Sequence, residues 1–282
     1  MNNKKRDNVI SFDKNWQKSL EIYYNHWTRK EPQNQIQLAF RNHWTLFREL
    51  MNNKFFNGGK RCLEVGCGRG TISEYFSDHG YHCTLLDLSE YALQRAKEIF
   101  SLNHLKGTFT IGDVNYLNFK DNSFDVVVSI GLLEHFSDIE PPIKEQIRVL
   151  DTGGIFLGYI VPKYRNNIQN KYEWINKILK AYVNKDCKIS PKKEFFRSDK
   201  GSAKYKQIMK KYNLKAINSS GVYPLPMISD SIEFPFTLMP DESEKAIVKH
   251  FNSILHQREK KGGHPWLCKE GYGQAFLVWG FK

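Results

Sequence analysis

The chain has 282 residues, of which 40% are hydrophobic and 14% aromatic, so it can form a folded core and global disorder is excluded. No stretch approaches the roughly 20 consecutive apolar residues that cross a bilayer, which excludes a membrane-spanning protein. The formal net charge of +12 divides into +6 over residues 1–60, −6 over 61–161 and +12 over 162–282.

Residues 10–55 are predicted to be helical, because apolar and aromatic residues recur every three or four positions. Pro32 divides this pattern, and Gly58 with Gly59 ends it. The aromatic residues of this stretch favour core packing, although one or two of them could contact a ligand. They include Tyr23, Tyr24, Trp27 and Trp44.

From residue 61 onward, short apolar runs alternate with amphipathic segments. The predicted strands are 62–65, 81–86, 108–111, 125–130 and 154–161, and the predicted helices are 71–78, 89–100 and 139–150. The unbroken β-branched run within 125–130 is typical of a strand buried on both faces. Strands that alternate with helices at this spacing predict a parallel sheet with right-handed crossovers.

After Pro162 the pattern is less regular. A polar, basic and aromatic insertion is expected over 163–197, and an irregular, packed segment with four prolines over 223–240. The regular elements expected here are a helix at 199–213, a strand at 214–222, a helix at 241–260 and a last strand at 274–281.

A strand followed by a glycine-rich turn and a helix is the most informative feature of the sequence. Gly66, Gly68 and Gly70 alternate with Cys67 and Arg69, and Asp87 follows 21 positions after Gly66. Glycines permit close approach of a ligand to the backbone, and an acid at the end of the second strand can accept hydrogen bonds from ribose hydroxyls. A nucleoside ligand is therefore predicted.

Two classes of nucleoside ligand compete at this turn. A dinucleotide site has a third glycine or alanine where this chain has Thr71, so the spacing disfavours NAD and FAD. Asp87 could instead cap the next helix, but Ser89 is the better cap, so a ribose contact is favoured.

Here the chain resembles the class I S-adenosylmethionine-dependent methyltransferases, in particular the small-molecule branch of types 11 and 12. The resemblance covers about residues 61–161 well and 274–281 loosely. Five motifs match in order: EVGCGRG, LLDLS, GDV, FDVVVSIGLLEHF and LDTGGIF. Five elements in correct order are more specific than a glycine loop alone.

The resemblance implies S-adenosylmethionine as the cofactor. It places Asp87 on the ribose, Asp113 near the adenine amino group, and Glu64 in the cofactor site directly or through water. The other positions carried over as cofactor-binding are Gly66, Cys67, Gly68, Leu88, Val114 and Ile130. Cys67 is interpreted as a small loop residue rather than a nucleophile, and Arg69 as a surface charge.

Glu134 and His135 follow the fourth strand, where a histidine could accept a proton from the nucleophile. A structural role is the alternative, because many members of the resembled family carry a similar pair. In the ubiquinone-biosynthesis O-methyltransferases a related E-x-x-E-H pattern binds a divalent metal, but Gly131 replaces the first acid here. No metal is predicted.

The resemblance also implies the fold class. It is α/β, a Rossmann-like doubly wound sheet of seven mostly parallel strands with an antiparallel last strand. The expected domains are a helical cap at 1–57, a cofactor-binding core at 58–162, a basic insertion with substrate-side elements at 163–240, and a closing helix and strand at 241–282. Tyr223 and Phe234 could line the substrate side or pack against the last helix.

Three functions remain open. The first is methyl transfer to an oxygen or nitrogen of a small metabolite. The second is methylation of RNA through the basic segment 163–215, although the motifs of adenine N6 and cytosine C5 enzymes are absent. The third is a non-catalytic cofactor-binding protein. A lysine-rich solvated surface explains the basic charge without any partner, and oligomeric state is not indicated.

The cysteines and the first residues bear on the compartment. Five cysteines form no CxxC pair, so a disulfide framework and a structural zinc site are not expected. The first residues are basic without an apolar run behind them, which disfavours a secretory signal. Reduced thiols in a cytoplasmic protein are therefore expected.

Overall fold

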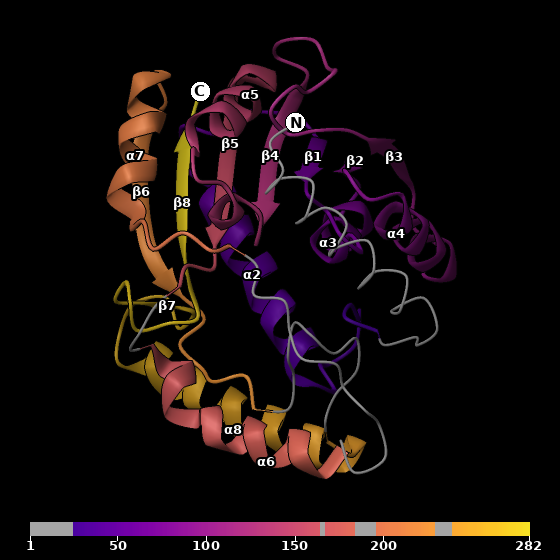
Figure 1. Ribbon diagram of the computed structural model, residues 1–282, viewed down its shortest axis with the longest axis vertical. Coiled ribbons are helices and arrows are strands. Elements are labelled where there is room, and N and C mark those ends of the chain that lie inside the picture. The colour runs from indigo at the N-terminus through magenta and orange to yellow at the C-terminus, as the bar shows by residue number, and fades with distance from the viewer. Residues whose placement is uncertain (1–24, 164–166, 184–195, 229–238) are drawn as a thin grey trace.

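The computed structural model describes residues 25–163, 167–183, 196–228 and 239–282. Figure 1 shows one twisted sheet with helices on both faces. Within the described residues the sheet has eight strands in the order β3-β2-β1-β4-β5-β8-β6-β7. The strands are β1 (Arg61–Val65), β2 (His82–Asp87), β3 (Gly107–Ile111), β4 (Phe124–Ile130), β5 (Leu150–Ile160), β6 (Lys215–Val222), β7 (Leu267–Cys268) and β8 (Ala275–Phe281).

The first five strands form the predicted parallel half of the sheet. Strands β1 and β4 lie side by side, with Leu63 opposite Val127. On one side of β1 lie β2 and then β3, and on the other side of the β1–β4 pair lies β5. The strand order therefore reverses between β1 and β4, and the carboxyl edge at such a switch point is where open α/β sheets bind ligands.

The other half of the sheet contains antiparallel pairs. Strand β8 lies between β5 and β6 and is antiparallel to both, with Leu277 opposite Tyr159 on one side and Ser220 on the other. The predicted antiparallel last strand and the predicted strand at 214–222 are confirmed. The two-residue β7 pairs with the end of β6 and makes the sheet one strand wider than expected.

Helices cover the sheet on two faces, each with its own apolar cluster. The helices are α2 (Gln35–Met51), α3 (Thr71–Asp78), α4 (Glu90–Leu102), α5 (Glu140–Val149), α6 (Ile168–Val183), α7 (Ser202–Lys211) and α8 (Asp241–Lys260). Side chains of α2, α3, α4 and α8 pack into one cluster, and those of α5 and α7 into the other. The sheet is thus buried on both sides, which explains its long apolar runs.

Two expectations differ from the structure near the ends of the predicted segments. Within the range predicted as helical, residues 25–34 are not helical; α2 begins after Asn34, whose side chain accepts the amide of Gln37 at 2.9 Å, and residues 1–24 lie outside the described part. Strand β5 begins four residues early, because Leu150 already pairs with Phe124.

The insertion after β5 holds a helix that was not predicted. Helix α6 covers Ile168–Val183 within the segment expected to be a polar, basic and aromatic insertion. None of the helices in the described parts of the chain is long and apolar enough to cross a membrane.

Candidate functional site

The glycine turn follows β1, and its φ angles are ones that residues with a side chain rarely adopt. The φ angles of Gly66, Gly68 and Gly70 are +67°, +52° and +76°. The amides of Gly66 and Cys67 both donate to the carbonyl of Leu86, at 2.8 and 3.1 Å. These bonds tie the turn to the end of β2.

The turn also lies against the loop that follows β4. A Cβ atom added at Gly66 would come within 2.7 Å of Leu132 Cδ1, closer than real Cβ contacts allow. The glycine is therefore required both by its φ angle and by this close approach.

Asp87 ends β2 with its carboxylate at the glycine turn. Its Oδ2 accepts the amide of Gly68 at 2.8 Å, and its Oδ1 accepts the amide of Ser89 at 2.9 Å. Ser89 caps α4, with its hydroxyl oxygen 3.3 Å from the amide of Ala92. Ser89 is therefore the residue that caps α4, as expected. The two amides fix the orientation of the Asp87 carboxylate. The contact of Asp87 with a ribose stays a prediction.

Glu64 lies beneath the turn in an apolar environment. Its side chain is 4% exposed, and Oε2 accepts the amide of Ser73 in the first turn of α3 at 3.1 Å. Burial is the main cause that raises its pKa to about 8. In this structure Glu64 joins β1 to α3, and its predicted cofactor contact is untested.

The turn after β3 lies beside the end of β2. The amide of Gly112 donates to the carbonyl of Asp87 at 3.0 Å, and Asp113 Oδ1 accepts the amide of Asn115 at 2.9 Å. Val114 is buried and Leu88 is half-buried. Two of the predicted acids therefore stand on neighbouring turns, at the same edge of the sheet.

Cys67 has the environment of a packed side chain. It is 6% exposed, and burial raises the pKa of its thiol well above the usual value. A thiol that resists deprotonation is a poor nucleophile. The structure thus agrees with its interpretation as a small loop residue.

Arg69 is less exposed than a surface charge would be. Its guanidinium Nη1 lies 2.9 Å from His26 Nε2, and burial followed by the charge of Arg69 lowers the pKa of His26. This contact joins the glycine turn to the segment before α2. The sequence offered no signal for it, because the two residues are 43 positions apart.

Strand β4 ends at Ile130, and a single 3-10 turn, η1 (Leu133–His135), carries the predicted catalytic pair. Glu134 is 1% exposed, its Oε2 has no hydrogen-bond partner among the described residues, and burial raises its pKa to about 7. His135 Nδ1 lies 2.8 Å from the carbonyl oxygen of Phe196, and burial lowers its pKa.

The pair is held from the other side by the segment before α7. Besides the contact of Phe196 with His135, the amide of Ser198 donates to the carbonyl of Glu134 at 2.7 Å. The amide of Gly131 donates to the carbonyl of Tyr159 at 2.9 Å. The loop after β4 is therefore fixed against β5 and against residues 196–198.

Tyr223 belongs to an aromatic cluster that the sequence did not reveal. It is buried and stacks on Trp266, with ring centroids 4.7 Å apart, while Trp266 Nε1 donates to His43 Nδ1 at 2.9 Å. His43 also packs edge-on against Tyr159, with centroids 4.6 Å apart. Tyr223 thus packs in the core next to β5. Phe234 lies outside the described residues.

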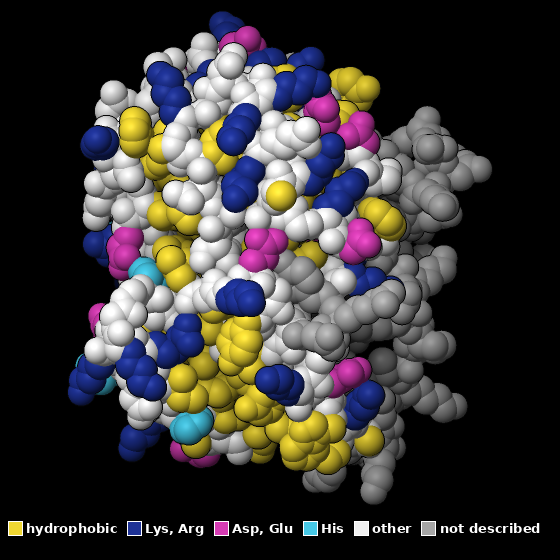
Figure 2. All heavy atoms as spheres, turned by 90° about the vertical axis from the view of Figure 1, so that its left-hand side faces the viewer, with side chains coloured by type: hydrophobic (Ala, Val, Ile, Leu, Met, Phe, Trp, Pro, Cys, Tyr) yellow, Lys and Arg dark blue, Asp and Glu magenta, His cyan; other side chains and the backbone are white. Residues whose placement is uncertain are grey.

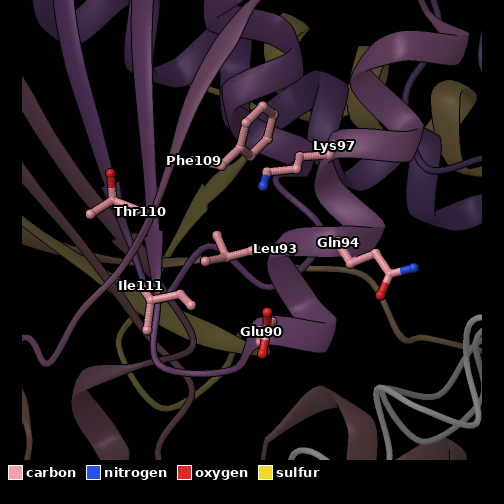
Figure 3. A pocket seen from close by; sticks show the side chains of 7 residues that line it. All are labelled: Glu90, Leu93, Gln94, Lys97, Phe109, Thr110 and Ile111. Carbon is pink, nitrogen blue, oxygen red and sulfur yellow. The ribbon is translucent and has the colours of Figure 1, made fainter.

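A surface groove of about 510 Å³ lies between α4 and the edge strand β3. Figure 3 shows Leu93 pointing from α4 toward Ile111 on β3, with Phe109 and Lys97 near one end and Glu90 near the other. None of its lining residues is a predicted cofactor residue, so this groove is distinct from the glycine turn. Across the described ranges, no three His, Cys, Asp or Glu residues lie together as metal ligands would.

Comparison with known proteins finds a family match over part of the chain. Residues 63–158 match the model of a family described as a methyltransferase domain. The chain is 37% identical over 134 residues to demethylmenaquinone methyltransferase of Leptospira interrogans, which covers 45% of this chain and 52% of the relative. It is 33% identical over 96 residues to ubiquinone biosynthesis O-methyltransferase of Coxiella burnetii, covering 34% and 41%. The chain thus spans about half or less of the length of these curated relatives.

Solved structures extend the likeness over most of the chain. The YcgJ protein of Bacillus subtilis superimposes with a TM-score of 0.54 at 21% identity, covering 86% of this chain and 98% of that one. At this identity the likeness concerns the fold. It covers more of the chain than residues 63–158, which the family model matches.

Proposed function

We propose that the chain is a class I S-adenosylmethionine-dependent methyltransferase and that it transfers a methyl group from S-adenosylmethionine to an oxygen or nitrogen atom of a small molecule. The observation that carries this proposal is the Asp87 carboxylate, held by the amides of Gly68 and Ser89 at the switch point of the sheet. A carboxylate fixed there suits the paired hydroxyls of a ribose.

The residues present fit this cofactor. The turn carries glycine at three positions with positive φ angles, and a ligand can approach such backbone closely. Asp87 would hold the ribose, and Asp113 with Val114 would meet the adenine from the neighbouring turn. When bound, S-adenosylmethionine supplies a methyl carbon that is already activated by a positively charged sulfur.

The remaining tasks of this chain are to position the acceptor, exclude water and hold a proton. Leu132 closes against Gly66, and the loop that carries it is fixed to β5. With Nδ1 facing the Phe196 carbonyl, the neutral His135 ring carries its proton on Nδ1 and its basic lone pair on Nε2. Nε2 of His135 would then accept the proton that the acceptor loses.

The acceptor class follows from the relatives. One is named for demethylmenaquinone and the other for ubiquinone biosynthesis, and both names denote small molecules. The matches cover 45% and 34% of this chain, so a small organic acceptor is the part of the likeness that we carry over.

Equilibrium binding of S-adenosylhomocysteine to the purified chain tests the cofactor assignment. Calorimetry should show one site per chain, and NAD should not compete for it. Absence of S-adenosylhomocysteine binding, or its displacement by NAD, would remove the basis of the proposed function.

Replacement of the predicted base separates binding from chemistry. His135→Ala should leave the affinity for S-adenosylhomocysteine unchanged and slow methyl transfer by about 10²-fold or more. His104→Ala serves as the matched control, because His104 follows α4 and lies far from His135 in the sequence. An unchanged rate in His135→Ala would assign His135 a structural role, held by Phe196.

A further inference from the structure

Helix α6 exposes an apolar stripe to solvent. Trp174 and Ile178 are 60% and 59% exposed, and Ala181 is also exposed one turn further on. These residues follow one another at helical spacing, so they share one side of the helix. A tryptophan and an isoleucine that are each about 60% exposed on one helix face are unusual for a surface that contacts only water.

The opposite side of α6 is attached to the molecule by side-chain hydrogen bonds. Gln169 donates to the carbonyl of Met227 at 3.0 Å and accepts the amide of Met227 at 2.8 Å. Asn176 donates to the carbonyl of Ile228, and the amide of Ile168 donates to the carbonyl of Tyr272 at 2.7 Å. Because these contacts fix the rotation of the helix, the apolar stripe is directed outward.

Cationic side chains accompany the stripe. Lys171 and Lys177 are exposed on α6, and only Lys177 has an acidic neighbour among the ion pairs of the described residues, Glu173 at 3.5 Å. Residues 162–282 carry a net charge of +12. Figure 2 shows hydrophobic side chains gathered in the lower half of one face, with Lys and Arg side chains around them.

From this arrangement we infer that α6 docks on the surface of a bilayer that contains anionic lipids. Tryptophan and isoleucine enter the boundary between headgroups and acyl chains, and flanking lysines reach the anionic headgroups. Ile178 and Ala181 offer no stacking surface or hydrogen bond to a nucleic acid base, so the stripe fits a bilayer better than RNA. Within a bilayer, aliphatic side chains are buried without a matching partner surface.

Docking of α6 would also bear on how the acceptor reaches the site, an inference that rests on the proposed function. Helix α6 is joined to residues 227–228, which lie within the segment 223–240 expected on the acceptor side. Docking through Trp174 and Ile178 would hold that segment close to the membrane. An acceptor that partitions into lipid would then reach the protein without crossing water.

Vesicle sedimentation tests the inference with the full chain. The protein should pellet with vesicles of equimolar phosphatidylcholine and phosphatidylglycerol, more weakly with phosphatidylcholine alone, and less as salt is added. The double variant Trp174→Ser with Ile178→Ser should lower the partition coefficient about tenfold or more. Lys171→Glu with Lys177→Glu should remove the preference for the anionic vesicles.

The controls separate the possible outcomes. Tyr116→Ser removes another aromatic side chain that is 81% exposed, and it should partition like the unmodified chain. Equal binding by the Trp174 and Ile178 variant, no binding to either vesicle, or displacement from vesicles by an RNA oligonucleotide would each overturn the inference. Calorimetry with S-adenosylhomocysteine on the same samples reports separately on the proposed function, because α6 lies outside the predicted cofactor residues.

Discussion

Asp87 connects the sequence motif to the proposed chemistry at the level of a single residue. Its two oxygen atoms accept the amides of Gly68 and Ser89, so its position is set by the backbone on both sides. A carboxylate with fixed geometry loses little further entropy when it binds hydroxyl groups. This is why the ribose contact is expected to contribute measurably to affinity.

The first prediction concerns this carboxylate. Asp87→Ala should weaken binding of S-adenosylhomocysteine by about 1–3 kcal/mol, because hydrogen bonds to a charged group are lost. Calorimetry measures the change, and thermal unfolding checks that the fold persists. Asp121→Ala is the control, since Asp121 pairs with Arg148 before β4 begins, at the other end of that strand. Equal affinity in the Asp87 variant would exclude the ribose contact.

Glu74 allows a second prediction, on pH and stability. Its side chain is 1% exposed in α3, Asn103 donates to its Oε2 at 2.6 Å, and burial raises its pKa from 4.5 to about 8. Between these pH values the folded chain keeps a proton that the unfolded chain has lost. The free energy of unfolding should therefore fall as pH rises from about 5 to 8.

Glu74→Gln should remove this share of the pH dependence. The variant should be close to the unmodified chain near pH 5 and exceed its free energy of unfolding at pH 8 by roughly 4 kcal/mol. Urea unfolding at several pH values measures this. Glu98→Gln, at a side chain that is 43% exposed, should change little. A Glu74 variant with an unchanged pH slope would contradict the effect of burial.

For single residues, the sequence predicted which functional residues lie together better than it predicted what surrounds each side chain. The spacing of Gly66, Gly68 and Asp87 predicted their meeting at one edge, because parallel strands end together. It could not show that Tyr223 stacks on Trp266, or that Arg69 contacts His26. Those contacts join segments far apart in the chain, and no local pattern records them.

The glycine turn is the element on which the site depends. Gly66 combines a φ of +67° with a close approach to Leu132, whereas Gly262 has a φ of +91° and, among the described residues, no atom within 4 Å of an added Cβ. The two glycines thus share a φ angle that other residues rarely adopt, and they differ in contact. This pair separates the conformational role of glycine from its role in leaving room for the Leu132 side chain.

The third prediction uses this pair. Gly66→Ala should lower thermal stability and weaken S-adenosylhomocysteine binding by about tenfold or more, because the new methyl displaces Leu132 and shifts the turn. Gly262→Ala should lower stability by about 1 kcal/mol through strain alone and keep the affinity. Calorimetry and thermal unfolding distinguish the two. Unchanged affinity in Gly66→Ala would mean that no ligand approaches this backbone.

Elements with strong local signals were predicted well, and α6 was not. The run in β4 and the caps around α4 determine those elements with few alternatives. In the insertion, lysines and asparagines obscure the apolar spacing of α6, and part of its apolar side faces solvent. A helix whose apolar residues are divided between core and surface gives a weak periodicity signal.

For the whole molecule, the sheet depends on a strand that comes last in the chain. Strand β8 lies between β5 and β6 and pairs with both. Its side chains, including Phe276 and Phe281, are buried between the two helical layers. The parallel half can be anticipated from the order of its motifs, whereas the pairing of β8 with β6 depends on contacts that only the folded chain brings together.

The fourth prediction follows from this central position. A chain that ends at Gln274 should lose cooperative unfolding, because β5 and β6 lose their common neighbour and their backbone groups are left unpaired. Circular dichroism and proteolysis measure the loss. Lys282→Ala is the milder control, since it removes side-chain bonds to carbonyls such as Leu150 at 2.7 Å and leaves the strand intact. A truncated chain that unfolds cooperatively would contradict this view of the sheet.

The most direct test of the central claim is a methyl-transfer assay with labelled S-adenosylmethionine. Purified protein is incubated with a cell extract, and the label is then separated into RNA, protein and small-molecule fractions, with a nuclease-treated control. If the proposed function is correct, label appears in the small-molecule fraction, is insensitive to nuclease and is reduced in Asp87→Ala. Nuclease-sensitive label in RNA, or label in no fraction although S-adenosylhomocysteine binds, would contradict it.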